Sequence, residues 1–114
     1  MESEMDFLRK LFGGGSGGAK VAGDPDGLYY FVRPDGCDEV VRVRVNRLND
    51  LSLMDDGSYW VHKLVRGVKC RQQVELDLYY DSGRKLKNTE VSGGTLMTEE
   101  DFEAWTASQN SYEA

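Results

Sequence analysis

Two stretches of the chain alternate apolar with polar side chains, and this alternation limits the fold more than any other feature of the sequence. In residues 39–46, three valines alternate with Arg42, Arg44 and Asn46. Residues 72–80 repeat the pattern, with Val74, Leu76, Leu78 and Tyr80 on one face and Glu75, Asp77 and Tyr79 on the other. A strand with this period buries one face and leaves the other in water. The pattern therefore predicts a sheet with one apolar side.

Further strands are expected at residues 28–33, 58–65 and 85–91, where aromatic and β-branched residues lie between turn-forming Asp, Pro and Gly residues. The last of them is more polar, which is typical of an edge strand. Connections are short apart from a polar loop over residues 47–57, so an up-and-down antiparallel order is the simplest topology. We therefore predict an α+β fold built on a curled antiparallel five-stranded β-meander, with an open barrel as the alternative closure.

A C-terminal helix is predicted over residues 99–107, after Gly93-Gly94 has ended the sheet. Thr98 and Asp101 resemble a capping box, with Asp in place of the usual Glu or Gln. The aromatic side chains that can share one helix face and dock it on the sheet are Phe102 and Trp105. Residues 108–114 are expected to be frayed.

The N-terminal residues 1–12 have the pattern of a short amphipathic helix. At about 100° per residue, the apolar side chains fall within an arc of roughly 160°. They are Met5, Phe7, Leu8, Leu11 and Phe12. The glycine-rich residues 13–20 then predict a flexible linker to a β-rich domain over 21–107. A helix this short is marginal alone in water, so we expect it to act as a tether that folds on a partner or membrane surface, or to pack on its own domain.

The charge balance limits the classes of partner. The chain has 114 residues and a net charge of −6, with the acidic excess at its two ends. General nucleic-acid binding requires Lys and Arg to neutralise phosphates, so nucleic acid is not the expected partner. A local basic set remains a candidate anion-binding patch: Arg42, Arg44, Arg66, Lys69 and Arg71. A solvated sheet face with cross-strand ion pairs is the commoner explanation of such a set.

The two cysteines, Cys37 and Cys70, lie in turns that the meander places at the same end of the sheet. The acidic N-terminus does not resemble a secretory leader, so we expect a cytoplasmic protein whose cysteines are free thiols filling small gaps. A disulfide or redox pair and a metal site are the alternatives. With one histidine in the chain, a tetrahedral zinc site would lack a ligand, and we expect no bound metal or cofactor.

Residues 28–46, the segment Lys69–Arg71 and residues 93–105 resemble a family of short, uncharacterised bacterial proteins. That family carries Cys-x-x-Cys at the first hairpin and a further cysteine in the later turn. The resemblance implies a metal-knuckle-like cluster in relatives. Here Pro34 stands where the first cysteine would be, so such a site would be lost or crippled in this chain. The family brings no known activity.

No pattern in the sequence indicates an enzyme. His62 lies between Trp60 and Leu64 on one strand face, which favours a packed, hydrogen-bonded histidine over a catalytic one. We therefore expect a small non-enzymatic interaction or adaptor module, tethered through residues 5–12 to a protein partner or, weakly, to a membrane surface. The alternatives are a nucleic-acid or anion-binding β-domain using the basic set, and a degenerate zinc or redox module at Cys37 and Cys70. A homodimer formed by pairing of an exposed edge strand is a further alternative.

Overall fold

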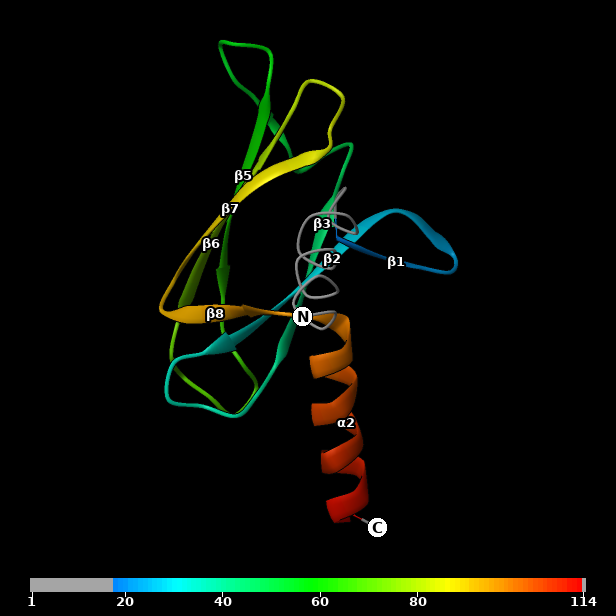
Figure 1. Ribbon diagram of the computed structural model, residues 1–114, viewed down its shortest axis with the longest axis vertical. Helices are drawn as coiled ribbons and strands as arrows, with labels where there is room; N and C mark the ends of the chain where they lie inside the picture. Colours follow the sequence, from blue (N-terminus) through cyan, green and yellow to red (C-terminus); the bar gives the residue numbers. More distant parts are fainter. Residues whose placement is uncertain (1–17, 114) are drawn as a thin grey trace, which may run out of the picture.

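The computed structural model describes residues 18–113, which form two four-stranded antiparallel sheets and a C-terminal helix (Figure 1). The first sheet contains β1 (Ala19–Val21), β2 (Asp24–Pro34), β3 (Val41–Asn46) and β8 (Gly94–Met97). The second sheet contains β4 (Ser52–Leu53), β5 (Tyr59–Val65), β6 (Val74–Tyr80) and β7 (Leu86–Ser92). The helix is α2 (Glu99–Glu113). The fold is therefore mostly antiparallel β, with one helix among the described residues.

The long strand β2 organises the first sheet. One of its edges pairs with β3, from Gly27 opposite Asn46 to Val32 opposite Val41. β1 pairs with the first part of β2, and β8 pairs with its second part, residues 31–34. Because β3 occupies one edge of β2, β1 and β8 share the other edge. The second sheet has the simple order β4-β5-β6-β7.

The core lies between the two sheets. The alternation in residues 41–46 and 74–80 is confirmed, because the apolar side chains of both strands are buried or partly buried in the core cluster. The buried core residues are Leu28, Tyr30, Val32, Val43, Val45, Val61, Val65, Val74, Leu76, Leu78 and Tyr80. The hydroxyls of Tyr30 and Tyr80 form a buried hydrogen bond of 2.7 Å between the sheets. Burial raises the pKa of Tyr80 to about 12 and raises that of Tyr30 further, so both hydroxyls are protonated at neutral pH.

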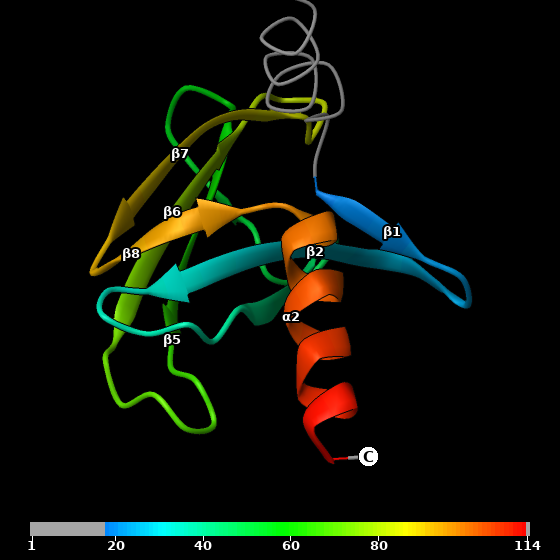
Figure 2. The same ribbon diagram turned by 60° about the horizontal axis from the view of Figure 1, so that its bottom comes forward.

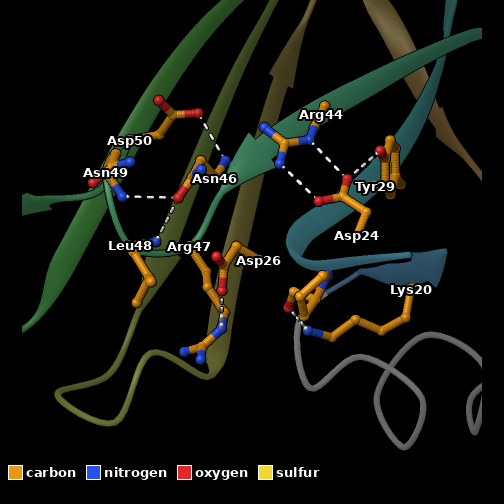
Figure 3. Close-up of polar contacts among 11 residues, drawn as sticks. Lys20, Asp24, Asp26, Tyr29, Arg44, Asn46, Arg47, Leu48, Asn49 and Asp50 are labelled. Atoms are coloured by element: carbon orange, nitrogen blue, oxygen red, sulfur yellow. Dashed lines mark hydrogen bonds and ion pairs between the residues drawn. The ribbon is translucent and has the colours of Figure 1, made fainter. Parts of the chain in front are cut away.

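The expected single five-stranded meander is wrong in one respect. Strands β2 and β3 belong to one sheet, whereas β5, β6 and β7 form a meander in the other, and the two sheets do not close into a barrel. A polar turn redirects the chain after β3. The side chain of Asn46 accepts hydrogen bonds from the backbone of Leu48 and Asn49, and Asp50 accepts one from the backbone of Asn46 (Figure 3). This turn lets the chain cross to the second sheet instead of pairing beside β3.

The two glycines at 93 and 94 do not end the β-structure. Gly93 has a positive φ of 83°, a conformation that favours glycine, and it turns the chain out of β7. Gly94 then begins β8, where a Cβ atom would lie 2.7 Å from the backbone oxygen of Arg33. The pair therefore forms the corner at which the chain passes from the second sheet to the first.

Helix α2 packs on the outer side of β2 (Figure 2). The capping box is confirmed, because Thr98 Oγ1 accepts the backbone N–H of Asp101 and the Asp101 carboxylate accepts that of Thr98. The Phe102 ring lies 5.4 Å from the ring of Phe31 and 6.4 Å from that of Trp105, so the aromatic docking is also confirmed. Residues 108–113, expected to be frayed, continue the helix, because no Gly or Pro follows Ala107 to stop it. No helix among the described residues is long and apolar enough to cross a membrane.

Two predictions concern the N-terminal part of the chain. The amphipathic helix predicted over residues 1–12, with Met5, Phe7, Leu8, Leu11 and Phe12, lies outside the described residues. Ala19 and Lys20, assigned to the linker from their sequence, belong to β1, which pairs with β2 as far as Ala19 opposite Tyr29. The β-rich body therefore begins two residues earlier than the turn signals indicate.

Candidate functional site

Two loops meet at one end of the molecule, where the chain leaves β2 and β5 (Figure 1). Cys37 in the first loop and Cys70 in the second form a disulfide, with a Cα–Cα distance of 6.3 Å. The predicted proximity of the two cysteines is confirmed, and the expectation of free thiols is wrong, because the fold brings the sulfur atoms to bonding distance. Within residues 18–113 there is no cluster of three or more His, Cys, Asp or Glu side chains that could hold a metal ion.

A buried carboxylate ties the same two loops together. Glu39, only 7% exposed, accepts hydrogen bonds from the backbone N–H groups of Val68 (2.8 Å), Lys69 (3.0 Å) and Cys70 (3.1 Å). Burial by itself raises the pKa of Glu39, but the three N–H donors and the Lys69 ammonium lower it below its usual value. Gly67 leaves room for this contact, because a Cβ there would overlap the Glu39 carboxylate. Sequence reasoning missed this role, since an acid beside a turn is usually solvated.

These two restraints hold residues 66–71, which we call the anchored loop. Its apolar residue Val68 is 94% exposed, the most exposed of the large apolar side chains in the described part of the chain. The cationic residues Arg66, Lys69 and Arg71 are exposed around it. The loop therefore presents one apolar side chain among cations on a backbone that is fixed at its base.

A cleft of about 260 Å³ lies between the anchored loop and α2. It is lined by Cys37, Asp38, Glu39, Lys69, Cys70, Trp105 and Gln109. The Lys69 ammonium reaches across it to donate a 3.5 Å hydrogen bond to Gln109 Oε1. Ligand pockets usually start at about 300 Å³, so this cleft is small for a ligand of drug size. The sequence did not indicate Gln109, because the predicted helix ended before it.

The predicted anion-binding set is divided by the structure. Arg44 donates two hydrogen bonds to the Asp24 carboxylate, at 2.8 and 2.9 Å, and the Tyr29 hydroxyl donates to the same carboxylate (Figure 3). The hydrogen bonds from Arg44 and Tyr29 hold the pKa of Asp24 well below its usual range. Arg42 lies over the ring of Tyr29 at 5.0 Å and over that of Phe102 at 5.7 Å. Both arginines thus have partners in the first sheet or α2. Arg66, Lys69 and Arg71 lie together in the anchored loop, where Arg66 donates a 3.3 Å hydrogen bond to Gln73 Oε1.

The outer side of the second sheet carries a second group of polar and aromatic side chains, which we call the acidic face. Its members are Trp60, His62, Leu64, Glu75, Asp77, Tyr79 and Glu90. Asp77 Oδ1 lies 2.8 Å from His62 Nδ1 and accepts a 3.1 Å hydrogen bond from the Trp60 indole. The Tyr79 hydroxyl donates to Glu90 at 3.2 Å.

His62 therefore has an acidic partner that the sequence did not reveal. Strand register places His62 directly opposite Asp77, and Glu75 Oε1 lies 4.0 Å from its other ring nitrogen. The expected hydrogen bonding of His62 is confirmed, but the side chain is on the solvent side of the sheet and not packed in the core. Leu64 on the same face is 60% exposed.

Comparisons with protein-family models, with curated proteins and with solved structures found no match for this chain. The resemblance to short bacterial proteins thus stays a prediction. Any inference about function therefore depends on the geometry of the described residues and on the sequence itself.

Proposed function

We propose that this chain is a small non-enzymatic interaction module that binds a protein partner through the anchored loop. The observation that carries the proposal is the 94% exposure of Val68 on a loop fixed by a disulfide and by three hydrogen bonds to Glu39. A loop already held in one conformation loses little entropy on binding. An exposed apolar side chain on such a loop can fill a partner's pocket and act as a binding hot spot.

The charges around Val68 indicate what kind of surface it fits. Arg66 and Arg71 are exposed, and Lys69 faces the cleft that Asp38 also lines. Cations around an apolar centre favour an apolar pocket with an acidic rim. Nucleic acid is the weaker alternative, because the chain has a net charge of −6 and because Arg42 and Arg44 are occupied by internal partners.

An array of peptides that combine Asp and Glu with large apolar residues tests the loop. We expect the chain to bind a subset of these peptides. Val68→Asn and the double variant Arg66→Gln/Arg71→Gln should each weaken binding about tenfold or more, which corresponds to about 1.4 kcal/mol. The matched control is Lys85→Gln/Lys87→Gln, which removes the same charge from two exposed positions at the start of β7 and should leave binding unchanged.

Two results would contradict this function. Peptide binding that neither loop variant weakens would show that another surface is used. Retention on heparin that falls with salt and is lost in Arg66→Gln/Arg71→Gln, without any peptide binding, would favour the nucleic-acid or anion-binding alternative.

We also propose a second attachment, through the N-terminal tether Met5 to Phe12. The apolar arc that these residues form supports this proposal. Removal of residues 1–12 should abolish co-sedimentation with anionic phospholipid vesicles and leave the circular dichroism of the β-rich body unchanged. A single short helix with three acidic residues binds such vesicles weakly, so a small pelleted fraction is expected. If neither chain pellets, the N-terminal segment either packs on its own sheet or binds a protein groove, and membrane attachment is contradicted.

A further inference from the structure

We propose that the partner of the anchored loop is a second copy of this chain, and that the loop of one copy binds the acidic face of the other. The inference rests on the proposed function, because it names the surface that the loop binds. Two described surfaces of the same molecule carry it.

The first surface is the loop, with Val68 at its tip and Arg66 and Arg71 exposed beside it. The backbone at its base is fixed by the Cys70 disulfide and by the hydrogen bonds to Glu39, so the positions from which these side chains project are fixed. The loop therefore offers one apolar and two cationic contacts at defined positions.

The second surface has the complementary chemistry. On the acidic face, three strands place their outward side chains in register: Trp60 opposite Tyr79, His62 opposite Asp77 opposite Glu90, and Leu64 opposite Glu75. Trp60 and Tyr79 thus form an apolar pair on one side of the row His62–Asp77–Glu90, and Leu64 lies beside Glu75 on the other side of that row. The face therefore combines three carboxylates with three large apolar or aromatic side chains. In the first sheet α2 packs on the outer side of β2, whereas on this side of the second sheet His62, Leu64, Glu75 and Glu90 are exposed.

The two surfaces are also continuous along the chain. The loop begins directly after β5 and ends shortly before β6, and these two strands carry most of the acidic face. Leu64 lies two residues before Arg66, and Glu75 lies four residues after Arg71. A two-fold axis at this end of the molecule would therefore give two identical loop–face contacts and a closed dimer.

The net charge does not prevent this association. Two copies of charge −6 repel each other at long range, but at physiological ionic strength this repulsion is screened beyond about 8 Å. Pairs of opposite charge in contact are screened much less. The dependence on total salt therefore mixes two opposed effects, and exchange of the charges is the sharper test.

The experiment is a reciprocal charge exchange in the full chain, followed by sedimentation velocity over micromolar to millimolar concentrations. The loop variant is Arg66→Glu/Arg71→Glu, and the face variant is Glu75→Lys/Glu90→Lys. We expect the unchanged chain to dimerise and each variant alone to have a dissociation constant raised about tenfold or more. An equimolar mixture of the two variants should recover the dimer, because both loop–face contacts then join opposite charges.

Two controls keep the result interpretable. Circular dichroism and thermal unfolding show whether each variant is folded, and Val68→Asn, which changes no charge, should also raise the dissociation constant. Lys85→Glu/Lys87→Glu makes the same change of net charge as the loop variant, but at positions outside both surfaces. Its dimer should be weakened at most slightly, by net repulsion.

The possible failures are distinct. A chain that stays monomeric at all concentrations overturns the self-association, while binding of the peptide array through Val68 still supports the proposed function. A dimer that none of the variants weakens also overturns it and indicates another interface, such as pairing of the edge strand β7. If both variants lose the dimer and their mixture does not recover it, the loop and the face do not contact each other.

Discussion

Replacement of Cys37 and Cys70 together by serine is expected to lower the free energy of unfolding by about 3–4 kcal/mol. The bridge joins residues separated by 33 positions, and closing a loop of that length removes this much conformational freedom from the unfolded chain. For a domain of this size, whose total stability is about 5–15 kcal/mol, the loss is large. Urea denaturation of the oxidised wild-type chain and of the double variant measures it.

The reduced wild-type chain is the control for this experiment. If the covalent link is responsible, wild-type protein unfolded in the presence of a thiol reductant should match the Cys37→Ser/Cys70→Ser variant. A difference of less than about 1 kcal/mol between oxidised and reduced chains would show that the fold holds the two loops without the bridge.

Glu39→Gln is expected to destabilise the protein by about 2–4 kcal/mol. The glutamine keeps one oxygen acceptor, but its NH₂ group faces a backbone N–H donor and the charge that strengthens all three hydrogen bonds is lost. Asp38→Asn is the matched control, because it removes the same charge from the adjacent, exposed position. It should change stability by less than about 0.5 kcal/mol. Equal effects in the two variants would contradict the proposed role of Glu39.

The pH dependence gives an independent test of Glu39. Its pKa in the folded protein lies below the ordinary value of 4.5, so its ionised form is the one that stabilises the fold. This stabilisation is fully present above the pKa of the unfolded chain and is lost as the pH falls through the pKa of the folded state. The difference between wild type and Glu39→Gln should therefore be constant near neutral pH and decrease below about pH 5.

The sequence predicts the strands better than it predicts their partners. Alternation identifies which side of β3 and β6 is buried, because the period of two depends only on neighbouring residues. It does not say which strand lies beside which. The division into two sheets depends on hydrogen bonds in the turn at Asn46 and on the corner at Gly93. At both sites the sequence indicates only that a strand ends, and not which sheet the chain enters next.

The candidate site shows the same limit. The meander correctly brought Cys37 near Cys70, because both lie in turns at one end of the sheets. The partners of Glu39 are backbone N–H groups about 30 positions away, and backbone donors leave no mark in a sequence. The contact between His62 and Asp77 depends in the same way on strand register, which the turn length between β5 and β6 does not determine.

The return of β8 to β2 has a consequence for the order in which the molecule is completed. One edge of β2 is shared by a strand near the beginning of the described chain and by residues 94–97, close to its end. During synthesis the second half of that edge stays unpaired until residues 94–97 have left the ribosome, and Phe31 stays uncovered until Phe102 emerges. Contacts between such distant segments form slowly, and until they form the unpaired strand edge can pair with other chains and promote aggregation. Among the described strands, the long strand β2 is made early but gains its last neighbour only when β8 is made.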